Sequence, residues 1–186
     1  MIENNTMEEF PFLLINDIER TLAADPLFRQ GLDYGRPRRG HPEGAIKYHI
    51  AAVIKNIDSW YAPSPYYLSL RLVALIHDTF KFQVDTTKQR SGPNHHGAYA
   101  RRFAEQYITD DAVLDIIELH DEAYNAWGAG DRRGNWKTAT KRATRLIERL
   151  GNKLDLYRAF YRCDNETGDK SQVGREWFEE LITKTT

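Results

Sequence analysis

The sequence predicts an all-α protein folded as a compact helical bundle. Apolar residues recur every three or four positions in nearly every segment, which is the spacing of one helix face. Nowhere are two alternating runs of β-branched or aromatic residues joined by a tight hairpin turn. The 186 residues, 41% of them hydrophobic and 28% charged, suffice for one globular domain with an ordinary core. We therefore expect a single helical domain over residues 1–186.

The N-terminal half should contain three helices separated by proline-containing breaks. The first, from Thr6 or Glu8 to Ala24, ends before Asp25-Pro26, because a residue that precedes proline avoids helical angles. A loop rich in Gly, Pro and Arg follows over residues 34–42. The second helix, from about Glu43 to Ser59, has an apolar face made of Ile46, Ile50, Val53, Ile54 and Ile57. The third helix, from Tyr66 to Asp78, is almost wholly apolar over residues 70–76, which predicts a central buried helix.

The C-terminal half is expected to hold the remaining helices. Residues 81–94, which follow His77-Asp78, read as a surface loop, and residues 128–134 read as a second, flexible loop. Between them we expect helices from His95 to Tyr107 and from Asp110 to about Tyr124, the latter capped by Asp110 or Thr109. The periodicity from Trp136 to Cys163 is continuous enough for one long helix, with a kink at Gly151-Asn152 as the alternative. A short helix over about residues 172–183 ends the chain.

Composition narrows the classes of function. The 26 basic and 27 acidic residues nearly cancel, so no overall field attracts a nucleic acid or an anionic membrane. The basic stretches 36–39 and 132–149 read as solvated surface, and nucleic acid is not an expected partner. No apolar run approaches the roughly 20 residues that span a bilayer, and no signal peptide is recognisable, so we expect a cytoplasmic protein without a membrane partner. The single cysteine, Cys163, excludes an internal disulfide and an all-cysteine zinc site.

The histidines suggest a metal site. All six lie between residues 41 and 120, and His77-Asp78 stands at the end of the predicted buried helix. Neutral imidazole and carboxylate are the usual ligands of divalent first-row metals, and adjacent helical residues project about 100° apart, which suits two positions around one ion. His49 from the second helix and Asp164 from the end of the long helix would complete the set and leave positions open for water and substrate.

The residues alone leave a second interpretation open. A histidine followed by an aspartate also arises by chance, and His120-Asp121 is another such pair in this chain. His49 and His77 could equally be core histidines whose rings bond to backbone groups.

The order of these residues resembles the signature of a known family. His41-Pro-Glu-Gly is followed by His49-Ile-Ala-Ala-Val53, then by Leu75-Ile-His77-Asp78-Thr-Phe-Lys81, and much later by Asp164. This order of histidine, His-Asp and aspartate resembles the HD superfamily of metal-dependent phosphohydrolases. The His41-Pro-Glu-Gly segment is similar to the corresponding segment of the HD domain in some bacterial tRNA nucleotidyltransferases, without the nucleotidyltransferase head. The resemblance covers about residues 41–165, between the first predicted helix (about residues 6–24) and the last.

The resemblance implies an all-helical fold of the HD type and a divalent metal ion held by His49, His77, Asp78 and Asp164. Manganese, iron, cobalt, nickel, zinc or magnesium would suit such ligands. Lys81 falls where the family often places a lysine three residues after the aspartate, and an ammonium there can hold a phosphate oxygen and offset transition-state charge. With Lys81, the predicted catalytic residues are His96 and His120.

The resemblance does not decide whether the site holds one metal ion or two. His95, His96 and His120 stand where two-metal members supply further histidines, and Asp78 could then bridge the two ions. In a one-metal site, His96 and His120 would instead be acid or phosphate-contact residues. The sequence does not separate His95 from His96, because neighbours on a helix face different ways. His41, which precedes a proline, lies either at the pocket mouth or on the surface.

The implied activity is that of a phosphatase or phosphodiesterase that acts on a nucleotide or another small phosphoester through a metal-activated water. The alternatives are a metal-containing regulatory module without activity and an RNA-binding helical module. An aromatic cluster surrounds a Pro-Ser-Pro turn and reads as the edge of the core, with a homodimer contact or a base-stacking surface as alternatives. Its members are Trp60, Tyr61, Tyr66 and Tyr67.

Overall fold

The computed structural model describes residues 10–39 and 42–185, and in those two ranges the prediction of an all-α fold is confirmed, with no β-strand. Within the described ranges, three 3-10 segments, η1 to η3, lie between the α-helices. In chain order the elements are α1 (Asp17–Ala24), α2 (Pro26–Leu32), α3 (Ile46–Tyr61), α4 (Tyr67–Ile76), η1 (Lys81–Gln83), η2 (Gly92–Asn94), α5 (His96–Ala104), α6 (Asp111–Leu119), α7 (Glu122–Asp131), α8 (Trp136–Leu150), η3 (Gly151–Lys153), α9 (Leu154–Asn165) and α10 (Val173–Thr185).

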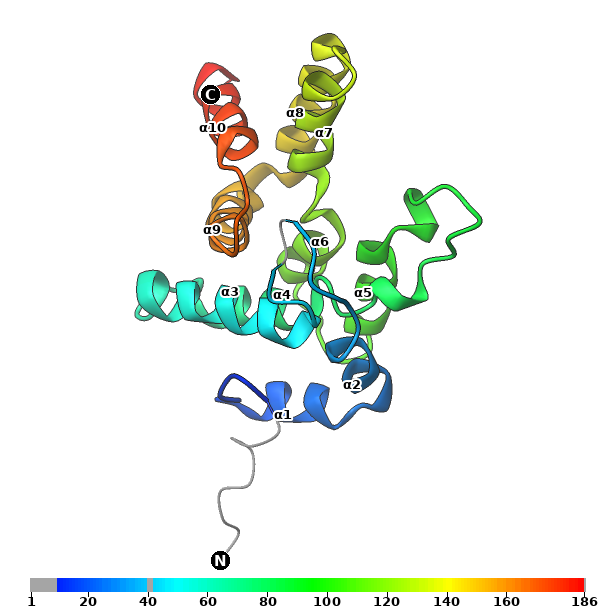
Figure 1. Cartoon of the computed structure of the whole chain (residues 1–186). Helices are drawn as coiled ribbons and strands as arrows, with labels where there is room; N and C mark the ends of the chain where they lie inside the picture. The colour runs from blue at the N-terminus through cyan, green and yellow to red at the C-terminus, as the bar shows by residue number, and fades with distance from the viewer. Residues whose placement is uncertain (1–9, 40–41, 186) are drawn as a thin grey trace, which may run out of the picture.

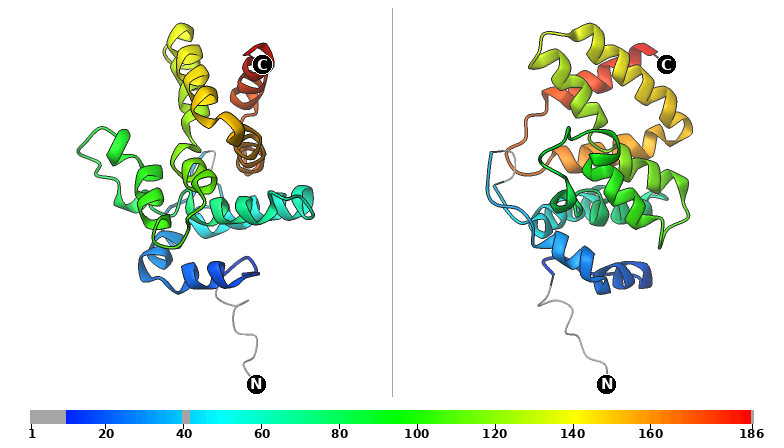
Figure 2. Two further views of the ribbon diagram at one scale, coloured as in Figure 1. Left: turned by 180° about the vertical axis from the view of Figure 1, so that it is seen from behind. Right: turned by 90° about the vertical axis from the view of Figure 1, so that its right-hand side faces the viewer.

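Helix α4 lies at the centre of the bundle. It packs against α3, α6 and α9, and residues 73–76 are fully buried, which confirms the predicted central helix. The first two helices lie on one side of α3 and α4, whereas α7, α8 and α10 lie on the opposite side (Figures 1 and 2). All five apolar residues predicted for the α3 face are buried. No described helix is long and apolar enough to cross a membrane.

The first helix begins later than predicted. Its predicted start at Thr6 or Glu8 lies outside the described residues, and residues 10–16 are not helical. Phe10, Phe12 and Leu14 are buried while Leu13 and Ile15 are exposed, so this segment follows the alternation of an extended chain. The predicted end at Ala24 is confirmed. We did not predict α2, in which Asp25 accepts hydrogen bonds from the backbone amides of residues 27 and 28 and Pro26 takes the first helical position.

Two predicted helices are each broken into two. The helix expected over residues 110–124 is capped by Asp110 as predicted, but it stops at Leu119 and resumes at Glu122. The segment 136–163 turns at Gly151, whose φ of 50° favours glycine, so α8 and α9 are separate helices rather than one.

The prediction of a flexible loop over residues 128–134 is wrong for the first four of them, because α7 continues to Asp131. Gly130 lies so close to α8 that a Cβ atom there would be 2.3 Å from the ring of Trp136. Glycine is therefore used here for a close helix contact, which the sequence pattern does not distinguish from a loop.

The other predicted segments agree with the structure apart from their ends. Residues 34–39 and 42–45 are not helical, and residues 81–94 form a loop that contains η1 and η2. The helix expected over residues 95–107 spans His96–Ala104, and the last helix spans Val173–Thr185. His41 lies outside the described residues, so its role stays a prediction.

Candidate metal centre

The two His-Asp pairs adopt the same local geometry. Each directly follows a helix, since α4 ends at Ile76 and α6 ends at Leu119. The Nδ1 atom of His77 lies 2.9 Å from the carbonyl oxygen of Ala74, and Nδ1 of His120 lies 2.9 Å from that of Ile117. A carbonyl oxygen can only accept, so Nδ1 carries the proton and Nε2 presents a lone pair, the form in which histidine binds metal.

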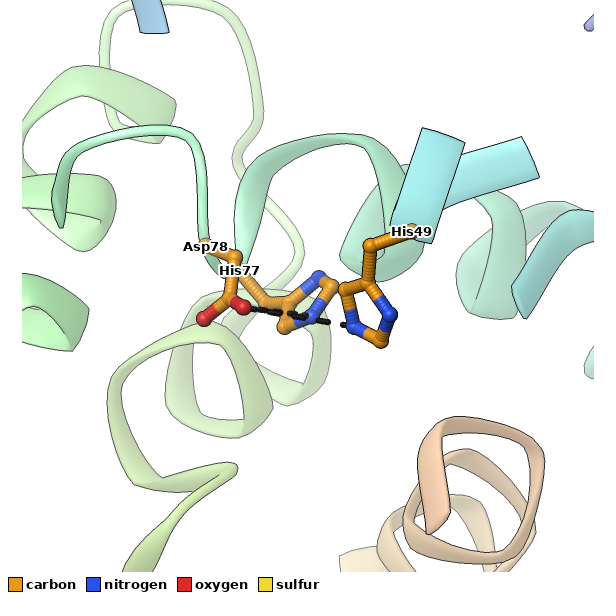
Figure 3. A group of neighbouring side chains, drawn as sticks. All are labelled: His49, His77 and Asp78. Atoms are coloured by element: carbon orange, nitrogen blue, oxygen red, sulfur yellow. Dashed lines mark ion pairs between the residues drawn. The ribbon is translucent and has the colours of Figure 1, made fainter. Parts of the chain in front are cut away.

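A first cluster consists of His49, His77, Asp78 and Asp164, the four residues predicted to hold one ion. The rings of His49, from α3, and of His77 converge with the Asp78 carboxylate (Figure 3), and one ligand atom of each lies within 4.8 Å of the others. Asp78 Oδ2 is 3.7 Å from His77 Nε2 and 3.9 Å from His49 Nε2. At the end of α9, Asp164 Oδ1 lies 2.8 Å from His49 Nε2 and 3.8 Å from His77 Nε2.

A second cluster consists of Asp78, His96 and His120. The Nε2 atoms of the two histidines are 3.0 Å apart, and they lie 3.2 Å and 3.4 Å from Asp78 Oδ1, respectively. The two oxygens of Asp78 therefore face different clusters, Oδ2 the first and Oδ1 the second.

The geometry of the second cluster fits a divalent ion. Two ligand atoms that are about 2.1 Å from one ion lie about 3.0 Å apart at an octahedral angle and about 3.4 Å apart at a tetrahedral angle. The distances of 3.0, 3.2 and 3.4 Å among these three ligand atoms fall in that range.

The first cluster contains a buried polar atom that a metal would satisfy. His77 Nε2 is buried and makes no hydrogen bond within the described residues. Such an atom costs about 1–3 kcal/mol, a cost that coordination would remove. Imidazole nitrogens and carboxylate oxygens also suit a divalent ion as ligands. The residues of each cluster therefore fit a divalent metal ion.

The protonation states at the first cluster suit metal binding. Burial lowers the pKa of His77 to about 3, so its ring is neutral at pH 7. Burial alone would raise the pKa of Asp78, but the nearby Lys81 and His77 hold it well below the usual range. The pKa of Asp164 is likewise well below its usual range, because Lys170 and His49 outweigh burial. Both carboxylates are therefore ionised, as ligands must be.

Two further histidines hold their protons more strongly. Burial and Lys170 lower the pKa of His49, but its interactions with Asp164 and Glu43 raise it by more. The pKa of His120 is also raised, because Asp121 and Asp78 outweigh burial. A cation bound between these groups would compete with those protons, so metal binding should release protons.

Two lysines pair with the carboxylates of the first cluster. Lys81 forms an ion pair with Asp78 Oδ2, and Lys170 Nζ lies 2.9 Å from Asp164 Oδ1. The Lys170 side chain is only 16% exposed, although the residue lies in the loop that follows α9. The site thus combines negative ligands with two ammonium groups at their edge.

The structure separates His95 from His96. His96 Nε2 belongs to the second cluster, whereas His95 Nδ1 accepts a hydrogen bond of 3.2 Å from the backbone amide of Gly97 and so caps α5. In neutral His95 the proton is then on Nε2, which lies 3.7 Å from Asp121 Oδ2. The imidazole of His95 is arranged as a hydrogen-bond donor, although its Nε2 also lies within 4.8 Å of ligand atoms of His96 and Asp121.

Sequence reasoning missed Asp121 and Glu43 as site residues. Asp121 Oδ2 lies 3.4 Å from His96 Nε2, and the repeated His-Asp dipeptide was the signal that could have pointed to it. Glu43 Oε1 lies 3.1 Å from His49 Nδ1, where it orients the ring, and the glutamate of the His-Pro-Glu-Gly step was its signal. For Lys170 the sequence indicates only a loop position near Asp164, because its contact with that carboxylate depends on the turn that follows α9.

The centre is open to molecules from outside. A small cavity beside the first cluster is lined by residues that include Tyr34, Arg38 and Lys81. A larger open groove passes Lys81, His95, His96 and Asp164 and continues along α7 and α8. A substrate could reach both clusters from this groove.

Comparisons with known protein families, with curated proteins and with solved structures return no match for this chain. The functional interpretation therefore depends on the geometry of an all-helical fold with buried His and Asp clusters that could hold metal.

Proposed function

We propose that this protein is an HD-type metal-dependent phosphohydrolase that acts on a nucleotide or another small phosphoester. The observation that carries the proposal is the position of Asp78, whose Oδ2 faces His49 and His77 while Oδ1 faces His96 and His120. A carboxylate between two sets of imidazoles is suited to bridge two divalent ions. The order of the site residues along the chain, which resembles the HD superfamily, supports the same conclusion.

In this proposal His49, His77, Asp78 and Asp164 hold the first ion, and Asp78, His96 and His120 hold the second. Bound divalent ions would supply Lewis acidity, which lowers the pKa of a bound water and offsets charge on the phosphoryl oxygens. His96 and His120 thereby act as ligands rather than as acids, because their Nε2 atoms face each other and Asp78.

Two groups are placed to act on the substrate directly. Lys81, whose side chain is partly exposed and lines the groove, can hydrogen-bond to a phosphoryl oxygen and stabilise its developing charge. His95 also lines the groove and carries its proton on Nε2, so it can donate a hydrogen bond to a phosphoryl or leaving oxygen.

Elemental analysis combined with phosphatase assays tests the proposal. Purified protein should contain two equivalents of divalent metal and hydrolyse p-nitrophenyl phosphate or nucleoside monophosphates. We expect His77→Ala and Asp78→Ala to lower activity by about 100-fold or more and to reduce metal content, while helical circular dichroism is retained. The exposed Asp155→Asn is the matched control and should behave as wild type. Full activity in either site variant would contradict the proposal.

A further inference from the structure

Three arginines on α8 face the groove beside the candidate metal centre. Arg142, Arg145 and Arg149 are separated by three and four residues, so they lie on one side of the helix, and all three line the groove. Helix α8 runs beside α7 (Figure 1), and the turn before α7 carries His120 and Asp121.

The two outer arginines are held by glutamates that flank the His120-Asp121 turn. Arg142 Nη2 lies 2.8 Å and 2.9 Å from the two carboxylate oxygens of Glu122. Arg149 Nη2 lies 2.9 Å from Glu118 Oε2. These pairs neutralise the two arginines and fix this face of α8 next to the turn that carries His120.

The middle arginine has no such partner. Arg145 is exposed and makes no ion pair or hydrogen bond with any residue in the described part of the chain. Arg142 and Arg149 are paired with glutamates, so Arg145 is the unpaired member of the row, and it presents its positive charge to the groove. Arg133, in the turn between α7 and α8, is likewise exposed and without an ion-pair partner there.

The groove as a whole is more basic than the chain. Its described lining contains ten Arg or Lys residues and six Asp or Glu residues, whereas the whole chain has a net charge of −1. Of the acidic residues, Asp164 and Asp121 face the histidines and lysines of the centre, and Glu118 and Glu122 are paired with arginines. On α8 itself, where Arg142 and Arg149 are paired with glutamates, the positive charge that remains at the groove is that of Arg145.

We infer that the groove binds a second, non-reacting phosphate of the substrate at Arg145 while the reacting phosphate lies at the candidate metal centre. This inference rests on the proposed function and adds the substrate class, a small phosphoester with two separated phosphate groups. A guanidinium binds phosphate through two parallel hydrogen bonds, which suits an arginine without a carboxylate partner. Arg145 lies about 6 Å along the helix axis from Arg149, which contacts Glu118 near His120, so the two phosphates would fit on one small molecule.

A nucleic acid is the less favoured occupant. The arginine row extends only about 10 Å along α8, and two of its three members are neutralised by glutamates. Few backbone phosphates could be contacted at once, whereas binding of a nucleic acid strengthens with the number of phosphates neutralised.

Calorimetric titration of the purified metal-containing protein tests the inference without using turnover. The probes are the phosphonate analogues of hexane-1,6-diol bisphosphate and of hexyl phosphate, here called the bisphosphate and hexyl phosphate. Their P–C bonds are not hydrolysed, and the two probes share a carbon chain and differ by one phosphorus group. Wild-type protein should bind the bisphosphate about 10-fold tighter or more, which corresponds to about 1.4 kcal/mol. Arg145→Gln should remove that advantage and leave the affinity for hexyl phosphate unchanged. Lys141→Gln is the matched control, because Lys141 is exposed on α8 and does not line the groove.

Equal affinity of wild-type protein for the two probes would overturn the inference, as would equal losses in Arg145→Gln and Lys141→Gln. Affinity for homopolymeric RNA that rises with its length and depends on Arg145 would assign the row to nucleic acid and also overturn it. If the bisphosphate binds through Arg145 and no phosphoester is hydrolysed, the proposed function fails while the subsite stands. If phosphoesters are hydrolysed and Arg145→Gln binds the bisphosphate normally, the subsite fails and the function stands.

Discussion

At the residue scale, backbone carbonyls determine which histidine nitrogen is available to a metal. His77 and His120 each donate from Nδ1 to the carbonyl three residues earlier, so both present Nε2 to the clusters. His95 differs, because its Nδ1 accepts from a backbone amide and its Nε2 therefore carries the proton. These hydrogen bonds give His95 a different task from that of His77 and His120.

Variants of the two adjacent histidines His95 and His96 should differ in metal content, because only His96 belongs to the second cluster. His96→Ala removes a ligand atom that lies 3.0 Å from His120 Nε2 and 3.2 Å from Asp78 Oδ1, so we expect it to lose the second equivalent of metal and keep the first. His95→Ala should retain the metal content of wild type and lose activity only. Elemental analysis of both variants checks this, and an equal loss of metal from His95→Ala would contradict it.

At the element scale, buried ion pairs connect segments that periodicity alone cannot position. Arg71 of α4 is 1% exposed and binds Glu19 of α1 through two hydrogen bonds of 2.8 and 3.0 Å. Its Nη2 also donates to the carbonyl oxygen of Leu13 at 2.6 Å. This contact holds Leu13 against the bundle. The Asn16 side chain caps the helix by accepting a hydrogen bond from the Glu19 amide, so the first helix starts at Asp17 rather than at Glu8.

Arg71→Ala should therefore be strongly destabilising. It leaves the buried carboxylate of Glu19 without its partner, which typically costs about 3–5 kcal/mol in the free energy of unfolding. Urea unfolding monitored by circular dichroism measures the change. Lys88→Ala, which breaks the exposed Lys88–Asp85 pair, is the control and should change stability by less than about 1 kcal/mol. Similar unfolding midpoints for Arg71→Ala and wild type would refute the expectation.

Asp115 predicts a pH-dependent stability at the junction of α5, α6 and η3. Its two oxygens lie 2.6 Å from Arg101 Nη1 and 2.5 Å from Lys153 Nζ. Burial would raise its pKa, but Lys153 and Arg101 outweigh burial and lower the pKa below the usual value. A carboxyl group with a lowered pKa contributes stability above the unfolded-state pKa of about 3.9, and that contribution is lost as the pH falls through the folded-state value.

Asp115→Asn should consequently destabilise the protein by about 1–3 kcal/mol at pH 7, because it removes a charged hydrogen-bond acceptor. The difference from wild type should shrink as the pH falls below about 4, where the wild-type carboxyl group also becomes neutral. Urea unfolding of both proteins over this pH range checks the prediction, and a difference that stays constant with pH would exclude the ion pair as its cause.

At the scale of the whole molecule, the close approach of α5 and α6 brings His96 to His120. A Cβ atom on Gly97 would lie 2.4 Å from the backbone carbonyl oxygen of Glu118, so only glycine permits this approach. The atom that this Cβ would meet belongs to the backbone, so rotation of a side chain cannot relieve the clash. The second cluster therefore exists because two helices pack at this distance.

Gly97→Ala should push α5 from α6, separate His96 from His120 and remove one equivalent of metal while the first cluster keeps its own. The control is Gly174→Ala, whose Cβ would lie 3.0 Å from the side chain of Trp127, away from the histidines. Metal content measured alongside thermal unfolding distinguishes a local loss from general destabilisation. Retention of the full metal content by Gly97→Ala would contradict the argument.

The sequence by itself determined the helical class and several helix ends, because periodicity, prolines and capping residues act within a few neighbours along the chain. It also indicated the residue types of a metal site through their order from His49 to Asp164. Only the tertiary structure decided that Asp78 faces two clusters, that His96 rather than His95 joins the second, and that His120-Asp121 interrupts a helix beside the first pair. Those outcomes depend on how α3, α5, α6 and α9 pack around α4, and contacts between segments so distant in the chain leave no local pattern in the sequence.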